Sequence, residues 1–253
     1  MRHSILIKAV LMATLIFSAF FLRPVHAAAL EECRLTEQLK ELEEVQKNFP
    51  WNETALSEEL RIRRGLLTSV LNCASSEIKT LQGNLKDTTP DAGLQKIQGR
   101  FSSQLESATR YYNEQKPKID LLNIIETKIL ARSILEWREI NYAPVAQKIE
   151  SFVTWKKNHE LVIAAKERFT QIIRTIENLK LGNYEDIKKF LKDAQSNLDQ
   201  AAQYNELAKQ VFINLELRDD SLRLVRASLQ ELSTAYERFF DISQAVNKVF
   251  PYY

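Results

Sequence analysis

The sequence predicts an all-α protein: an elongated antiparallel helical bundle or a chain of long helical hairpins with coiled-coil-like packing. Two observations predict this class. The 253 residues include only 5 glycines and 6 prolines, and strong helix formers such as Glu, Lys, Gln, Leu and Ala dominate. Apolar residues also recur at alternating three- and four-residue intervals over long segments, which is typical of helices that pack along a seam.

The first 27 residues are expected to be a signal peptide. Arg2 and Lys8 supply a basic start, and the largely apolar stretch from Ala9 to Leu22 is shorter than the roughly 20 residues of a membrane-spanning helix. A proline then breaks the helix, and Ala27 offers a small residue at the cleavage site. Cleavage there leaves residues 28–253 as an exported domain, periplasmic or secreted. The alternative is an uncleaved membrane anchor.

Removal of this segment changes the formal net charge, because the segment carries three basic residues and no acidic one. The charge then falls from +2 to −1. A near-neutral chain of mixed sign lacks the basic surface by which proteins bind nucleic acid, so we expect no nucleic-acid partner. The remaining 226 of 253 residues suffice for one large domain or for two parts, 28–115 and 118–253.

Prolines and turn residues divide the chain into helical segments. We expect helices at 30–48, 53–86, 91–115, 118–142, 144–181, 184–217 and 219–250. Asn52 suits the cap before the second helix, and Pro144 suits the first position of the fifth. Gly182 can close that helix in a left-handed conformation, and Asn183 can cap the next one. Short connectors make neighbouring helices run antiparallel.

Three of these helices carry long apolar stripes. The first stripe is Val162, Ala165, Phe169, Ile172, Ile176 and Leu179. The second is Ile187, Leu191, Ala194, Leu198, Ala201, Asn205, Ala208, Phe212 and Leu215, in which Asn205 is the one polar residue. The third is Leu222, Val225, Leu229, Leu232, Tyr236, Phe239, Ser243, Val246 and Phe250.

The segment 118–142 is apolar over a wider arc than the others. Its apolar residues are Ile119, Leu121, Leu122, Ile124, Ile125, Ile129, Leu130, Ile134, Leu135, Trp137 and Ile140. A helix that is apolar on several sides is usually buried, so we expect this segment to be central and contacted on more than one side.

Cys33 and Cys73 are expected to form a disulfide, because an even pair in an exported chain suggests one. Their midpoint is residue 53, at the turn between the first two helices, so both lie at the same height. Closing the loop would contribute roughly 4 kcal/mol. Cys33 points away from its helix stripe, however, which leaves two separate thiols as the alternative. Glu31 and Glu32 argue against a lipid on Cys33.

No catalytic, cofactor or metal site is expected. His159 is the one histidine after cleavage, so one chain cannot supply a two-histidine metal site. It lies between Trp155 and Val162 at a seam position, where a packed, hydrogen-bonded histidine is common. Carboxylates interleave with lysines and arginines, as on solvated helix faces. Asn52 also begins an N-glycosylation acceptor, Asn-Glu-Thr, and the sequence leaves open whether it carries a glycan.

Three functions agree with these observations. The preferred one is an exported interaction, scaffold or sensor module without catalytic activity, which binds a protein partner through helix faces and leaves a dimer open. The second is a membrane-surface-active or pore-forming protein, although the longest apolar run of the mature chain, 161–165, is too short to cross a bilayer. The third is a small-ligand binder with a pocket lined by Trp137, Tyr142, Trp155 and His159.

Overall fold

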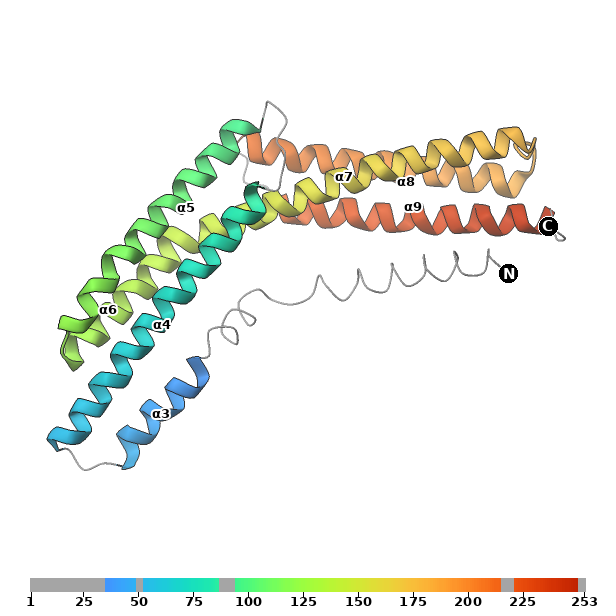
Figure 1. Cartoon of the computed structure of the whole chain (residues 1–253). Coiled ribbons are helices and arrows are strands. Elements are labelled where there is room, and N and C mark those ends of the chain that lie inside the picture. Colours follow the sequence, from blue (N-terminus) through green and yellow to red (C-terminus); the bar gives the residue numbers. More distant parts are fainter. Residues whose placement is uncertain (1–34, 49–51, 87–93, 215–220, 250–253) are drawn as a thin grey trace. The chain divides into compact units, whose positions relative to one another are not determined.

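The computed structural model describes residues 35–48, 52–86, 94–214 and 221–249 (Figure 1). Within these ranges the chain is helical and contains no strand. This confirms the predicted all-α helical bundle. The predicted signal peptide, its cleavage site at Ala27 and Cys33 lie outside the described residues. Cleavage and the bridge between Cys33 and Cys73 therefore stay predictions.

The helices follow the predicted order. They are α3 (Leu35–Asn48), α4 (Glu53–Lys86), α5 (Gln95–Gln115), the 3₁₀ helix η1 (Lys116–Leu121), α6 (Ile124–Trp137), the π-helix η2 (Arg138–Tyr142), α7 (Ala143–Asn178), α8 (Glu185–Ile213) and α9 (Ser221–Val249). The predicted helix 118–142 is divided, because Leu122 has an extended backbone and ends η1. Asn52 caps α4 as predicted, since its Oδ1 accepts a hydrogen bond from the Ala55 amide at 2.9 Å.

The chain forms two compact units, which we describe separately. Unit 1 holds the described residues up to Thr80 together with Leu105–Tyr142. Unit 2 holds the described residues of Leu81–Gln104 and of Ala143–Tyr253. The division of the chain into parts 28–115 and 118–253 stays a prediction.

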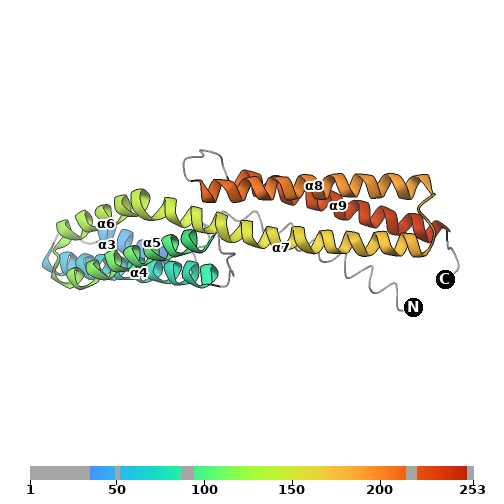
Figure 2. The same ribbon diagram turned by 90° about the horizontal axis from the view of Figure 1, so that it is seen from above.

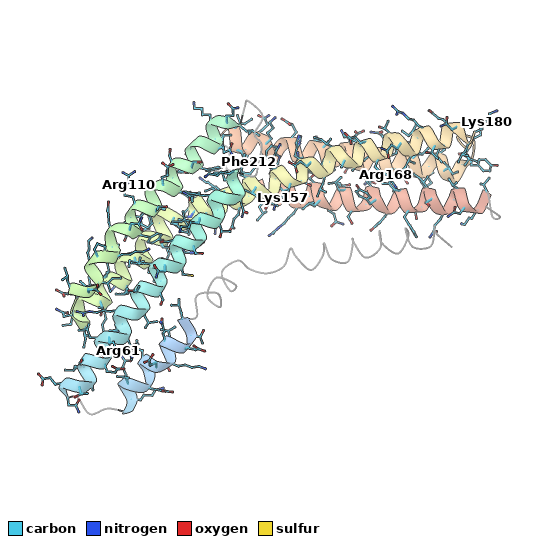
Figure 3. The ribbon with its side chains drawn as sticks, in the orientation of Figure 1. Arg61, Arg110, Lys157, Arg168, Lys180 and Phe212 are labelled. Carbon is cyan, nitrogen blue, oxygen red and sulfur yellow. The ribbon has the colours of Figure 1, made fainter. Side chains whose placement is uncertain are left out.

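In unit 1 the helices α4, α5 and α6 run side by side, and α3 lies along α4 (Figures 1 and 2). The buried residues of α4 keep the three-to-four spacing, as Leu67, Leu71, Ala74 and Ile78 show. Arg61 of α4 also reaches Glu41 of α3 at 2.8 Å (Figure 3). Because both side chains of this ion pair are largely exposed, it adds little to stability.

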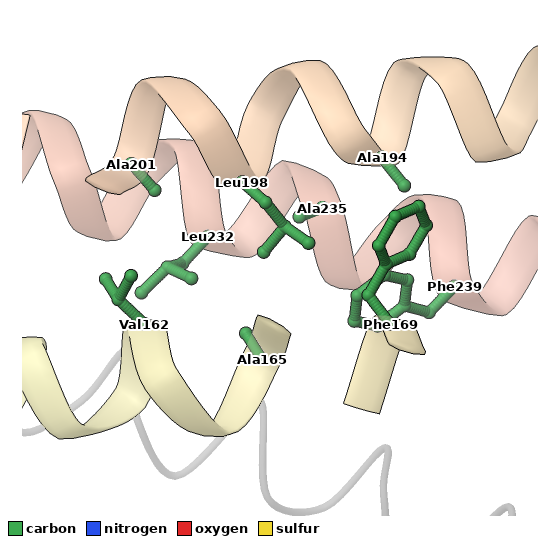
Figure 4. Close-up of a cluster of buried hydrophobic side chains, with 9 residues drawn as sticks. All are labelled: Val162, Ala165, Phe169, Ala194, Leu198, Ala201, Leu232, Ala235 and Phe239. Atoms are coloured by element: carbon green, nitrogen blue, oxygen red, sulfur yellow. The ribbon is translucent and has the colours of Figure 1, made fainter. Parts of the chain in front are cut away.

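In unit 2 the helices α7, α8 and α9 contact one another pairwise. Figure 4 shows the central cluster, to which each helix contributes three residues: Val162, Ala165, Phe169, Ala194, Leu198, Ala201, Leu232, Ala235 and Phe239. The rings of Phe169 and Phe239 stack with centroids 5.9 Å apart. The buried residues of α8 are the predicted stripe from Ile187 to Phe212, with Leu191 half-buried. Charged ends such as those of Lys157 and Arg168 extend outward (Figure 3).

The buried face of α9 differs from the predicted stripe. Tyr236 and Ser243 of that stripe are exposed, and Ser228, Ala235 and Ile242 are buried instead. At Ser228 and Ala235, therefore, the α9 face that packs inward carries small side chains. Small side chains allow neighbouring helices to approach closely, which large apolar residues at those positions would prevent.

The end of α7 also differs from the prediction. Lys180, not Gly182, adopts the left-handed conformation, with φ of 58°. The Leu181 amide donates to Ile176 O and the Lys180 amide to Glu177 O, both at 2.9 Å. This is a Schellman motif, and its apolar contact is present because Leu181 and Ile176 share one buried cluster. Likewise α8 is capped by Tyr184 without a side-chain hydrogen bond, not by Asn183.

Candidate interaction surface

The start of α6 is held in two ways, by hydrogen bonds within its own first turn and by hydrogen bonds from α4. Asn123 Oδ1 accepts from the Glu126 amide at 2.9 Å, and Glu126 Oε2 accepts from the Asn123 amide at 2.8 Å. This capping box satisfies two backbone donors at the helix start. Arg64 of α4 donates from Nε and Nη2 to Leu122 O at 3.1 and 2.6 Å. The first turn of α6 is thereby held against α4.

One side of α6 packs into unit 1. Thr127 and Ile134 are buried, seven residues apart and therefore on the same face. Trp137 stacks on Tyr111 of α5, with ring centroids 3.8 Å apart and an interplanar angle of 9°. Stacked aromatic pairs add to the stability that their buried area provides. This contact fixes which side of α6 faces the unit interior.

The π-helix η2 extends the buried side through an ion pair. Arg138 contacts Glu77 of α4 at 2.9 Å, and its guanidinium carbon lies 5.0 Å from the centre of the Tyr142 ring. Burial raises the pKa of the Tyr142 phenol and that of the neighbouring Tyr112 phenol.

Pro144 follows η2 near the start of α7. A proline cannot donate a backbone hydrogen bond, and its ring clashes with the preceding helical turn. The wider turn of the π-helix before Pro144 relieves this clash.

The other side of α6 is open to solvent, and this overturns the expectation of a central segment. Ile125, Ile129 and Ile140 are 69, 63 and 74 % exposed, and Leu121 of η1 is 83 % exposed. The apolar arc is present as predicted, but unit 1 covers only one side of it. Large apolar side chains gathered on one exposed side mark interaction sites more often than isolated ones do.

We call this open side the α6 face. It consists of Ile125, Ile129, Arg132, Glu136 and Ile140. Arg132 and Glu136 pair with each other at 2.9 Å while remaining mostly exposed. The wider turn of η2 keeps Ile140 in line with the others, because about four residues there complete a turn. The α6 face is thus an apolar line with one exposed ion pair at its middle.

A groove adjoins the N-terminal end of the α6 face. It lies between the first turns of α4 and the start of α6, and is lined by Leu56, Ser57, Leu60, Asn123, Ile124 and Ile125. Ile125 belongs both to the groove and to the α6 face. The apolar surface therefore continues from α6 onto α4.

The four residues predicted to line a pocket fall into two pairs. Trp137 and Tyr142 belong to unit 1, where both rings contact Tyr112, with centroids 5.4 and 6.2 Å away. Trp155 and His159 belong to unit 2, where their rings stack with centroids 5.6 Å apart. The common pocket stays a prediction.

His159 belongs to a polar layer inside unit 2. Its Nδ1 lies 2.9 Å from Asn205 Nδ2, as expected for a hydrogen-bonded seam residue. Trp155 Nε1 donates to Asn205 O at 2.8 Å. Asn158 Nδ2 donates to Asn205 Oδ1 at 2.9 Å and to Ser228 Oγ at 2.8 Å. One polar layer thus joins α7, α8 and α9.

Neither a metal-binding cluster nor a membrane-spanning helix is found among the described residues. No group of three His, Cys, Asp or Glu side chains is placed to hold a metal ion in the part of the chain that the structure describes. Among the helices in that same part, none has the length and apolar character needed to traverse a bilayer.

Comparison of the chain with protein-family models, with curated proteins and with solved structures found no match.

Proposed function

We propose that this chain is an exported helical interaction module, of scaffold or sensor type and without catalytic activity, which binds a protein partner through the α6 face. The observation that carries the proposal is the exposure of Ile125, Ile129 and Ile140 on one side of a helix whose other side is firmly packed.

Burial of the α6 face against a partner would lower the free energy of the exposed isoleucine side chains. Complete burial of an isoleucine side chain contributes about 1.5–3 kcal/mol. Three such side chains on one line therefore provide several kcal/mol toward association. The capping box and the Trp137–Tyr111 stack hold α6 in place, so little ordering of the surface opposes binding.

The charges beside these isoleucines favour a protein over a lipid surface. Helices that lie on membranes carry mainly Lys and Arg on their polar side. The exposed charges of α6 include Glu126, Glu136 and Glu139 besides Lys128 and Arg132. Such mixed signs suit a partner with its own pattern of charges, because complementary charges give a protein interface its specificity.

Export is supported by the sequence of the first 27 residues. The predicted signal peptide ends at Ala27. The predicted pairing of Cys33 with Cys73 would require an oxidising compartment. Mass spectrometry of the intact secreted or periplasmic protein tests this part: a chain that begins at Ala28 supports it, and a chain that begins at Met1 contradicts it.

Affinity purification from the producing cells tests the binding function. The full chain is compared with a variant that carries Ile125→Glu and Ile129→Glu, and with the control Leu207→Glu on α8, whose leucine is also partly exposed. We expect a protein, or further copies of the chain, to be recovered with the wild type and the control and to be lost with the α6 variant. Equal recovery with all three chains contradicts a role for the α6 face.

A further inference from the structure

The polar layer inside unit 2 has a fixed direction of hydrogen-bond donation. Ala201 O can only accept, and the Ser228 hydroxyl donates to it at 2.7 Å. The Ser228 oxygen therefore accepts from Asn158 Nδ2 at 2.8 Å. The same nitrogen donates to Asn205 Oδ1 at 2.9 Å. The Asn205 amide is thereby oriented with its nitrogen toward His159.

The layer ends at the His159 imidazole, which has to accept. Asn205 Nδ2 lies 2.9 Å from His159 Nδ1, and an amide nitrogen can only donate. Nδ1 is therefore unprotonated, and the ring is neutral with its proton on Nε2. A second proton, on Nδ1, would place two donors against each other. Asn205 is only 3 % exposed, so its N–H would lose its acceptor in the interior.

Reversal of the amides does not rescue the layer. If Asn158 and Asn205 both turned over, Asn205 Oδ1 would accept from the protonated ring, and Asn158 Oδ1 would accept from Asn205 and from Ser228. Ser228 would then give up its bond to Ala201 O. Nδ2 of Asn158 would take the place where Oδ1 now has no hydrogen-bond partner among the described residues. Asn158 is 1 % exposed, so the reversed layer would bury an amide N–H without an acceptor.

The charges around the layer are of both signs and do not decide the protonation of His159. The charged residues within about one turn of the layer are Lys156, Lys157 and Glu160 on α7, Glu206 and Lys209 on α8, and Arg226 and Glu231 on α9. None of these side chains is buried. Solvent and salt therefore screen their opposing effects on the imidazole.

The neighbouring Trp155 ring favours the protonated form of His159. The two rings stack with centroids 5.6 Å apart, and an indole face attracts a cation. This attraction raises the proton affinity by roughly two- to fivefold, whereas a buried amide left without its acceptor lowers it by roughly five- to a hundredfold. The hydrogen bond with Asn205 therefore decides the sign, and the folded chain binds this proton more weakly than the unfolded chain.

We propose that His159 is a pH switch that loosens the packing of α7, α8 and α9 when the surroundings of the protein become acidic. A histidine in an unfolded chain binds its proton at about pH 6.5. The stability that the layer contributes is complete above this range and is lost as the pH falls through it, because the unfolded chain takes up the proton first. The switch concerns unit 2 alone, and it does not depend on whether the α6 face binds a partner.

NMR titration of the imidazole Cε1–H signal tests the proposal on the purified mature chain. His159 is the one histidine of residues 28–253, and the signal is identified by its absence in His159→Gln. We expect half-protonation of the folded chain to require a proton concentration about fivefold higher than in the chain unfolded in urea. Equal or tighter proton binding by the folded chain overturns the proposal.

Asn205→Asp reverses the expected sign. A carboxylate at this position still accepts from Asn158, and it also accepts from a protonated His159. His159 should then bind its proton more tightly in the folded chain than in the unfolded chain. The matched control, Gln203→Glu, adds the same charge at an exposed position of α8 and should change the proton affinity less than twofold. Equal effects of the two substitutions would overturn the role of the hydrogen bond.

Hydrogen exchange of the α7, α8 and α9 amides measures the loosening itself. Between pH 7.5 and 5, after correction for the intrinsic exchange rate, the opening constant of the wild type should rise about fourfold relative to that of His159→Gln. The glutamine can still accept from Asn205, and it does not titrate. The same pH dependence in both chains would show that His159 is no switch.

Discussion

Asn158 of α7 donates a hydrogen bond to Asn205 of α8 at 2.9 Å in the interior of unit 2. Asn158 is 1 % exposed and Asn205 is 3 % exposed. The same Asn158 nitrogen reaches Ser228 of α9, whose hydroxyl donates to Ala201 O at 2.7 Å. A buried polar residue in an apolar seam can fix the register of the helices, because any shift would leave it without partners.

The first prediction concerns this polar layer. Asn158→Ala removes the donor to Asn205 and Ser228 and opens a cavity, so it should lower the free energy of unfolding by about 2–3 kcal/mol. The triple variant Asn158→Leu, Asn205→Leu and Ser228→Ala removes these three buried polar side chains at once, and the half-buried His159 ring loses its contact with Asn205 Nδ2. Urea unfolding should show it to be at least as stable as the wild type. A triple variant less stable than Asn158→Ala would contradict the account.

The second prediction concerns the end of α7. Lys180 has a positive φ, a conformation that glycine adopts without strain. Lys180→Gly should therefore raise the free energy of unfolding by about 0.5–1 kcal/mol, as measured by urea unfolding. The matched control is Lys192→Gly, at a solvent-exposed position inside α8, which should lower the free energy of unfolding by about 1 kcal/mol. Destabilisation by both substitutions would show that the Schellman turn is wrongly assigned.

The third prediction concerns pH. Burial raises the pKa of Tyr112 and Tyr142 above the usual value of 10.0. Their contribution to stability is complete below pH 10 and declines at higher pH, because the unfolded chain ionises first. The slope is at most about 1.4 kcal/mol per pH unit for each phenol. In the double variant Tyr112→Phe and Tyr142→Phe, the decline in unfolding free energy between pH 9.5 and 11 should be shallower; an unchanged slope would contradict the burial effect.

The fourth prediction concerns the start of α6. Asn123→Ala removes the hydrogen bond to the Glu126 amide and should lower the free energy of unfolding by about 1 kcal/mol. Asn123→Asp keeps an acceptor and should stay within a few tenths of the wild type. Thermal unfolding followed by circular dichroism compares the three chains. Equal losses for both variants would argue against the capping role.

Much of the fold could be predicted from local sequence signals. The α8 stripe is confirmed from Ile187 to Phe212, because the apolar side of this helix is narrow and leaves one choice of buried face. On α9 the apolar arc is wider, and Tyr236 and Ala235 compete for the interior. Helix packing decides for the smaller residue, and that depends on neighbours far away in the sequence. The capping box from Asn123 to Glu126 has a signal in the sequence, an Asn followed three residues later by Glu.

The interaction surface could be predicted only in part. The wide apolar arc of 118–142 is visible in the sequence, but an apolar arc has the same appearance whether its own chain or a partner covers it. Only the positions of α4 and α5 decide that Ile134 is buried and Ile129 exposed. Similarly, sequence distance does not show which aromatic side chains share a core: Trp137 and Tyr142 belong to unit 1, and Trp155 and His159 belong to unit 2.

The most direct test of the central claim is the accessibility of Ile129 in the producing cell. A cysteine at this position, Ile129→Cys, and a control cysteine, Leu207→Cys, are treated with a membrane-impermeant maleimide, and labelling is normalised to the unfolded protein. The account predicts that the control reacts readily from outside the cytosol while position 129 is at least tenfold slower, and that position 129 becomes reactive when the protein is purified and diluted. Equal and rapid labelling of both cysteines in the cell would contradict it.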